Sequence, residues 1–229
     1  MIAHRGASGH RPENTLPAYE LAVRQRADMI EIDLHRTRDG EIVVTHDELL
    51  QGLGGRGEIA DASLAEVRSL DAGGGERVPT LDEVLDGFGA RIPFNLELKQ
   101  STRGPYAGLV AETLKRVDSR GLLGATLFSS FYDPVLAELR ACSPGARIGV
   151  LVSSRAPEGC WERARRFGAE AVHFSVVLAT AETVAAAHAD GLSVHVYTVD
   201  EPDAMRRLLA IGVDGLFTNF PDRLRALVG

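Results

Sequence analysis

Residues 171–218 read AVHFSVVLATAETVAAAHADGLSVHVYTVDEPDAMRRLLAIGVDGLFT. Three short apolar runs in this stretch, Ala171–Phe174, Ser193–Val199 and Asp214–Thr218, are separated by two helical patterns at Glu182–Ala189 and Pro202–Ala210. The runs are too apolar for strands that are buried on one side only, which indicates parallel strands covered by helices. We therefore predict consecutive strand and helix units within one parallel sheet.

The same alternation extends outward to both ends of the chain. Further strands are predicted at Ile2–His4, Met29–His35, Ile92–Lys99, Thr126–Ser130 and Arg147–Val152. A turn at Asp39-Gly40 leads into a hairpin-like return, Ile42–Asp47, which we set aside from the count. Eight strands, each followed by a helix, in 229 residues predict a single (β/α)8 TIM barrel domain over residues 1–229. An open doubly wound sheet is the alternative.

Capping residues mark the start of several predicted helices. Asn14 or Thr15 is expected to cap a helix that runs to Arg26, and Ser63 and Thr80 each have an acid three residues on, as in a capping box. Residues 49–75 form a short insertion after the second strand. The GLGGRG sequence at 52–57 is predicted to be a loop, because a dinucleotide fingerprint needs a helix to open at its third glycine.

Composition excludes several classes of protein. The net charge of −7 argues against broad nucleic-acid binding, which needs a basic face. No apolar run is long enough for a transmembrane segment, and no secretory signal is recognised at the N-terminus, so we expect a cytoplasmic protein. Cys142 and Cys160 are expected to be buried free thiols. The oligomeric state is left open.

Acidic residues gather at the ends of two predicted strands. Glu31 and Asp33 are two residues apart and share a face, as residues along a strand do at this spacing, and Glu97 lies on another barrel strand. His35 is assigned to the opposite face. Because burying isolated carboxylates is costly, a shared cation explains the three acids best. An all-oxygen set suits one divalent cation, Mg²⁺ or Ca²⁺, better than zinc.

Basic residues lie at the same strand ends. Arg5 offers a planar fork for phosphate oxygens, and Lys99, one of only two lysines in the chain, offers a point charge. His4 and His46 are predicted to be a proton-transfer pair, because imidazole titrates near neutral pH. Cleavage of a phosphodiester needs one group that takes a proton from the nucleophile and another that protonates the leaving oxygen.

Six segments carry a resemblance to a known family: AHRGASGHRPENTLPAYE, EIDLHRTRDGEIVVTHD, PTLDEVL, FNLELK, SSF and GVDGLFTNFP. Together they resemble the glycerophosphodiester phosphodiesterase family, with the first 46 residues as the most specific part. The resemblance implies a metal-dependent TIM-barrel enzyme. Its substrates would be glycerophosphodiesters, cleaved to glycerol 3-phosphate and an alcohol. The short insertion at 49–75 leaves the site open, which favours small soluble diesters such as glycerophosphocholine or a broad specificity.

The resemblance also implies roles for individual residues. It makes His4 and His46 the general acid and base, Arg5 and Lys99 phosphate ligands, and the three acids at 31, 33 and 97 metal ligands. It further suggests attack by the substrate's own glycerol 2-hydroxyl, giving a cyclic phosphate that water then opens. Tyr197 stands in the position of the family's tryptophan and is expected to bind substrate on the pocket wall.

Several interpretations remain open beside this one. Asn219 stands where the family usually has aspartate, and we expect this departure to affect the leaving group. His195 shares a face with Tyr197 on the expected pocket wall, and His173 either contacts substrate or is structural. A related phosphodiesterase that acts on lysophospholipids or phosphoinositides, and a non-catalytic phosphate-binding barrel, are the rival functions. A metal-dependent amidohydrolase is less favoured, because no His-x-His ends a strand.

Overall fold

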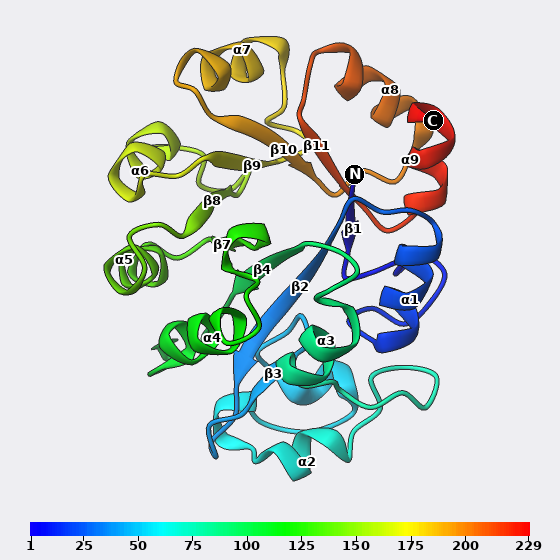
Figure 1. The fold of residues 1–229 in the computed structure, drawn as a ribbon, viewed down its shortest axis with the longest axis vertical. Helices are drawn as coiled ribbons and strands as arrows, with labels where there is room; N and C mark the ends of the chain where they lie inside the picture. Colours follow the sequence, from blue (N-terminus) through cyan, green and yellow to red (C-terminus); the bar gives the residue numbers. More distant parts are fainter.

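The computed structural model describes residues 1–229, and its strands close into a barrel surrounded by helices (Figure 1). Around the barrel the parallel strands are β1 (Ile2–His4), β11 (Gly215–Thr218), β10 (Ser193–Tyr197), β9 (Ala171–Ser175), β8 (Arg147–Val152), β7 (Leu127–Ser130), β4 (Phe94–Leu98) and β2 (Met29–Arg36). Pairing of β1 with β2 closes the ring, with His4 opposite Glu31. The predicted TIM barrel is confirmed, and the open sheet is excluded.

The outer layer consists of helices that connect successive strands, with one more helix after the last strand. They are α1 (Leu16–Arg24), α3 (Leu81–Phe88), α4 (Leu109–Asp118), α5 (Asp133–Cys142), α6 (Cys160–Phe167), α7 (Ala181–Ala189), α8 (Pro202–Ala210) and α9 (Pro221–Val228). Their apolar faces and the strands form one continuous core of 47 buried residues. Because strand, helix and interior share this single core, the barrel wall is rigid enough to fix the side chains at its ends.

The insertion after β2 packs as a separate small layer. It contains β3 (Ile42–Val44), antiparallel to β2, two 3₁₀ turns, η1 (Leu50–Leu53) and η2 (Ile59–Asp61), and the short helix α2 (Leu64–Arg68). A second apolar cluster holds it together, formed by Val43, Leu50, Ile59, Ala62, Val67 and Val78. No helix begins at Gly57, as expected for a loop. A short ribbon, β5 (Gln100–Ser101) with β6 (Gly104–Pro105), and the turn η3 (Leu123–Ala125) were not predicted.

All three predicted N-cap positions are confirmed, and two of them carry the full capping box. Ser63 and Thr80 each accept a hydrogen bond from the backbone N–H three residues on, and the acid at that position, Glu66 or Glu83, accepts from the cap's own N–H. Such a cap stabilises a helix by about 1 kcal/mol. Thr15 is the N-cap residue of α1 but makes no side-chain capping bond. The side chain of Asn14 is used elsewhere, as described below.

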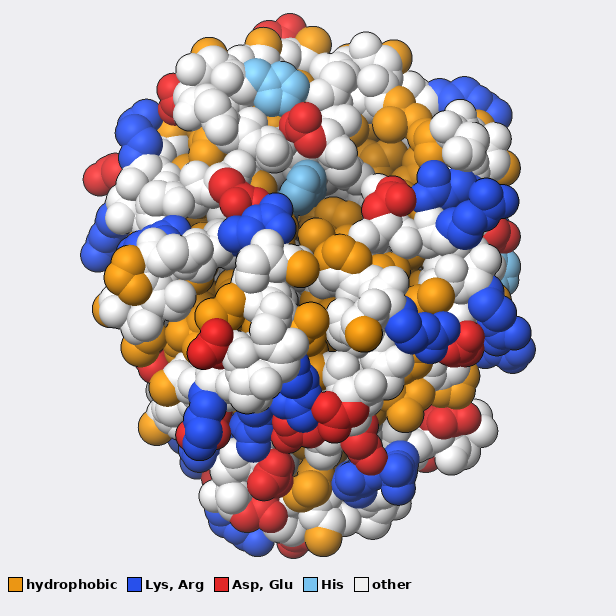
Figure 2. All heavy atoms as spheres, viewed as in Figure 1, with side chains coloured by type: hydrophobic (Ala, Val, Ile, Leu, Met, Phe, Trp, Pro, Cys, Tyr) orange, Lys and Arg blue, Asp and Glu red, His pale blue; other side chains and the backbone are white.

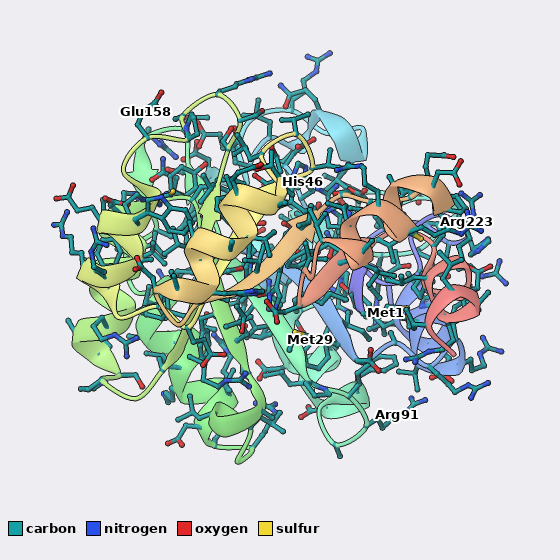
Figure 3. All side chains as sticks on the ribbon, turned by 90° about the horizontal axis from the view of Figure 1, so that it is seen from above. Met1, Met29, His46, Arg91, Glu158 and Arg223 are labelled. Carbon is teal, nitrogen blue, oxygen red and sulfur yellow. The ribbon has the colours of Figure 1, made fainter.

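The two ends of the barrel differ in what they present. Figure 3 places Met1 and Met29, at the starts of the first two barrel strands, toward one end and His46 toward the other. On the face of the molecule in Figure 2, basic and acidic side chains are interspersed around the periphery.

No helix here combines the length and the apolar character that crossing a bilayer would require. Both cysteines are free, but Cys142 is exposed, contrary to expectation.

Candidate active site

A cavity of about 140 Å³ opens among the residues at the carboxyl ends of the strands. Seven of the eight predicted site residues line it, and the eighth, Asp33, is buried and does not reach the lining. The complete lining is His4, Arg5, Glu31, His46, Asn95, Glu97, Lys99, Phe131, Leu151, Tyr197, Thr198 and Phe217. In a (β/α)8 barrel this is the end at which active sites form, because loops from several strands meet there. The structure therefore brings together predicted site residues that are up to 193 positions apart, from His4 to Tyr197.

Three buried carboxylates form the acidic part of the site. Glu31, Asp33 and Glu97 each offer an oxygen, and these oxygens lie within 4.8 Å of one another. The register explains the cluster, because β2 pairs with β4 so that Asp33 stands opposite Glu97. Lys99 bridges two of the acids, with its Nζ 2.8 Å from Asp33 Oδ1 and 2.5 Å from Glu97 Oε1. The spacing of two along each strand is what points all these groups to one face.

The protonation tendencies of these acids differ with their partners. Burial, reinforced by the charges of Asp33 and Glu97, raises the pKa of Glu31 well above its usual range. Burial also raises the pKa of Glu97, against the opposing effect of Lys99. For Asp33, burial acts in the same direction, but Lys99 and Arg5 outweigh it and hold its pKa below the usual range. Three like charges in one buried place are stable together only when cations balance them.

The donor set fits a divalent cation. Glu31 Oε1 is buried and has no hydrogen-bond partner. Asn95, also on the cavity wall, donates from Nδ2 to Ser129 Oγ at 2.9 Å, which leaves its buried Oδ1 without a partner. Buried oxygens are rarely left unpaired, so two orphaned acceptors in one cavity indicate a missing electropositive partner. Carboxylate and amide oxygens are the ligands that Mg²⁺ and Ca²⁺ prefer.

Arg5 holds two acids through its side chain and a third through its backbone. Its Nη1 lies 2.9 Å from Glu13 Oε2, and its Nε lies 3.2 Å from Asp33 Oδ2. Its backbone N–H donates to Glu31 Oε2 at 3.0 Å. The residue has a φ of 58°, a left-handed conformation that is costly for a residue with a side chain and often found at functional sites. The guanidinium thus sits at the cavity edge with donors still free for a ligand.

The two histidines occupy different environments. His4 donates or accepts through Nδ1 at 2.8 Å from Asn219 Oδ1, and burial together with the charge of Arg5 lowers its pKa to about 4. The imidazole of His46 is 38% exposed, and its Nδ1 lies 2.9 Å from Asp47 Oδ1. Both rings line the same cavity, one embedded in the barrel end and the other on the loop after β3.

His35 was assigned to the wrong face. It follows Asp33 by two residues, so strand alternation puts both side chains on the same side. Its imidazole is buried and pairs with Tyr106 Oη at 2.8 Å through Nδ1 and with the backbone oxygen of His46 at 3.1 Å through Nε2. Burial lowers the pKa of His35 to about 4. His35 therefore anchors the backbone of the loop that carries His46.

Two asparagines that sequence reasoning placed differently act on the site residues. Asn14 was expected as a possible helix cap, but its Nδ2 donates to Asp33 Oδ2 at 2.9 Å and its Oδ1 accepts from Tyr19 Oη at 3.2 Å. Asn219 was expected to affect the leaving group, but it contacts His4 and does not line the cavity. Thr15 fills the N-cap position of α1 instead, and Asn14 has a φ of 56°, a left-handed conformation that asparagine tolerates.

The wall opposite the charged groups is largely apolar, formed by Phe131, Leu151, Tyr197 and Phe217. The Tyr197 hydroxyl donates to the backbone oxygen of Val152 at 2.8 Å, so this residue presents its ring to the cavity. His173 and His195 do not line the cavity. His173 Nε2 and His195 Nδ1 are 3.2 Å apart, and His173 is fully buried, which favours a structural role over substrate contact.

Comparison with known proteins places the chain among phosphodiesterases. The model of the glycerophosphoryl diester phosphodiesterase family matches residues 4–223. A glycerophosphodiester phosphodiesterase of Caldanaerobacter subterraneus is 34% identical over 237 residues, covering 100% of this chain and 97% of that protein. One from Bacillus subtilis is 33% identical, covering 96% of this chain and 83% of that protein. An Oleispira antarctica phosphodiesterase, solved with its product sn-glycerol-3-phosphate, is similar with a TM-score of 0.91 and 30% identity, over 99% of this chain and 95% of that one.

Proposed function

The chain belongs to the glycerophosphoryl diester phosphodiesterase family, and we propose that it hydrolyses glycerophosphodiesters to glycerol 3-phosphate and an alcohol. The observation that carries this proposal is the shared cavity of Arg5, Lys99, two imidazoles and a buried acidic cluster. The product held by the Oleispira antarctica relative supports glycerol 3-phosphate as the part of the substrate to be recognised.

Glu31, Asp33 and Glu97 would hold one divalent cation, Mg²⁺ or Ca²⁺. When bound, such an ion stabilises the negative charge that develops on the phosphoryl oxygens. Arg5 and Lys99 would add charge-assisted hydrogen bonds to the same oxygens. Both side chains lie beside Asp33. They would therefore balance the charge of the acids in the free protein and the charge of the phosphate in the complex.

His4 and His46 would carry the proton transfers. One imidazole takes a proton from the attacking hydroxyl, and the other gives a proton to the oxygen of the departing alcohol. A positioned acid or base of this kind contributes typically about 10²- to 10⁴-fold to the rate. Removal of either ring should therefore abolish measurable turnover without unfolding the barrel, because neither ring is part of the apolar core.

The attacking hydroxyl would be the glycerol 2-hydroxyl of the substrate itself. A bond forms from this oxygen to phosphorus, and the bond from phosphorus to the leaving alcohol breaks, which gives a cyclic phosphate. Water then opens the ring to glycerol 3-phosphate, with the two histidines in exchanged roles. A hydroxyl already tethered next to phosphorus gains the large rate advantage of an intramolecular reaction.

A second candidate substrate class follows from the apolar wall, which offers contact area to an acyl chain of a lysophospholipid. The rest of the surface gives this class less support. The large apolar side chains exposed on the structure are in different segments: Leu49 just before η1, Val177 between β9 and α7, Leu209 on α8 and Val228 at the end of α9. We therefore propose small diesters as the principal substrates.

A substrate panel tests the proposal. Glycerophosphocholine, glycerophosphoethanolamine, glycerophosphoglycerol and lysophosphatidylcholine are incubated with the protein and Mg²⁺ or Ca²⁺. The released phosphomonoester is measured, which is glycerol 3-phosphate from the first three substrates and lysophosphatidic acid from the last. We expect turnover of the glycerophosphodiesters that is lost in His4→Ala and His46→Ala and kept in His188→Ala, a matched change of an exposed histidine on α7. Binding without turnover would support the non-catalytic barrel instead, and turnover of lysophosphatidylcholine alone would support the rival substrate class.

A further inference from the structure

We infer that Asn219 is a positioning residue for His4, whose side-chain amide fixes the imidazole in the tautomer that can accept a proton from the substrate. This inference rests on the proposed function, since it concerns the base of that reaction. It also assigns the two proton-transfer roles, which the shared cavity alone leaves undecided.

The location of Asn219 follows from the strand register. β1 pairs with β11 so that Ala3 stands opposite Thr218, and the next residues along, His4 and Asn219, leave the barrel side by side. Asp200 follows β10, the neighbour of β11 on its other side. Three adjacent strand ends therefore supply an imidazole, an amide and a carboxylate in a row.

The hydrogen bonds leave one orientation for the amide. Asn219 Nδ2 lies 2.7 Å from Asp200 Oδ2, and an ionised carboxylate can only accept, so this atom must be the donor nitrogen. Asp200 is itself fixed, because its Oδ1 accepts from the backbone N–H of Asn219 at 2.8 Å and from the hydroxyl of Thr218 at 3.1 Å. The amide oxygen of Asn219 is consequently turned toward His4.

The orientation of the amide determines the tautomer of His4. Asn219 Oδ1 is 2.8 Å from His4 Nδ1, and an amide oxygen cannot donate, so Nδ1 must carry the proton. The Ser8 hydroxyl lies 2.8 Å from the same amide oxygen and 2.7 Å from the backbone oxygen of His4, and it can donate its one proton to either of these acceptors. Nε2 then holds the free electron pair, and it is the ring nitrogen left for the cavity that His4 lines.

The consequence is a division of labour between the two histidines. A neutral His4 with a free Nε2 takes the proton of the attacking glycerol hydroxyl in the first step. His46, which is more exposed and is paired with Asp47, gives its proton to the leaving alcohol. Burial and the charge of Arg5 lower the pKa of His4 to about 4, which agrees with a ring that is neutral before substrate reacts.

The tautomer can be measured without any turnover. Long-range ¹H–¹⁵N correlation spectra of the ¹⁵N-histidine-labelled protein near neutral pH distinguish a proton on Nδ1 from one on Nε2, and the His4 signals are identified by their loss in His4→Gln. We expect the wild-type His4 to be protonated on Nδ1 alone and to become a mixture of tautomers in Asn219→Leu. A wild-type His4 protonated on Nε2, or an unchanged tautomer in Asn219→Leu, would overturn the inference, whatever the substrate of the enzyme.

Kinetics separate positioning from a general structural effect. Asn219→Leu should lower kcat by about 10- to 100-fold with KM changed less than about threefold, since the residue does not touch the cavity. Asn219→Asp alone places two carboxylates against each other and should lose activity. The double variant Asp200→Asn with Asn219→Asp again has one amide and one acid, and its kcat should be at least about tenfold higher than that of Asn219→Asp. A rise in KM with kcat unchanged in Asn219→Leu would contradict the inference, and so would a double variant whose kcat does not recover.

Discussion

Replacing Lys99 by methionine should destabilise the cation-free protein far more than it does the cation-bound protein. Lys99 is buried, and its ammonium contacts both Asp33 and Glu97. Methionine has nearly the length of the lysine side chain, so packing changes little in Lys99→Met. Three buried carboxylates are then left with Arg5 as the remaining nearby cation. Removal of one partner from a buried ion pair typically costs about 3–5 kcal/mol.

This cost can be converted into a melting temperature. For proteins of this size, 1 kcal/mol corresponds to a shift of about 2–4 °C, so Tm should fall by about 6–20 °C in EDTA. A divalent cation bound by the same acids supplies the missing positive charge. Added Mg²⁺ or Ca²⁺ should therefore raise the Tm of the variant more than that of the wild type. The difference in Tm between the two proteins should become smaller.

Differential scanning calorimetry in EDTA and in millimolar Mg²⁺ or Ca²⁺ measures both effects. The other lysine of the chain provides the control, because Lys115 is exposed on α4 and Lys115→Met should change Tm by less than about 2 °C. A Lys99→Met variant as stable as the wild type in EDTA, or one whose deficit is unaffected by the cation, would refute the account of this cluster.

Three further predictions concern single side chains. Glu31→Gln removes the carboxylate with the unpaired oxygen and should weaken binding of Mg²⁺ or Ca²⁺ by at least about tenfold in isothermal titration calorimetry; unchanged affinity would exclude Glu31 as a ligand. Tyr197→Phe should leave KM within about threefold, because the lost hydroxyl bonds Val152 and not substrate, whereas Tyr197→Ala should raise KM clearly in the same assay. Burial lowers the pKa of His195 to about 4, so below about pH 6.5 the unfolded chain binds a proton that the folded chain does not. The free energy of unfolding therefore decreases as the pH is lowered. His195→Gln should remove about 2 kcal/mol of the stability lost between about pH 7.5 and about pH 5 in urea unfolding; an equal loss in both proteins would contradict this.

The sequence allowed the barrel and most of its site to be predicted, because both depend on local patterns. Apolar runs, capping boxes such as Ser63 with Glu66, and the spacing of Glu31 and Asp33 are readable within a few residues. Once the strands are known to be parallel and to close, their carboxyl ends must meet, and polar residues there must share one mouth. The structure places all of the predicted acids at that mouth.

The contacts that orient the site residues could not be predicted in the same way. The bond from Asn14 to Asp33 spans 19 positions and the one from His4 to Asn219 spans 215, and each depends on the register of closed strands. Asn219 was noticed as a departure from the family pattern, but it was connected with the leaving group. The sequence shows that Asn219 is near the mouth of the barrel, but it does not show which way the side-chain amide points. The role of His35 was missed through a wrong assignment of face, although the alternation rule itself predicts the observed side.

The most direct test of the account is the release of glycerol 3-phosphate from glycerophosphocholine by protein that has been dialysed against EDTA and then titrated with Mg²⁺ or Ca²⁺. We expect no turnover after dialysis and full recovery when about one ion per chain is bound. Undiminished turnover in excess EDTA would show that the three acids do not serve a cation in this reaction.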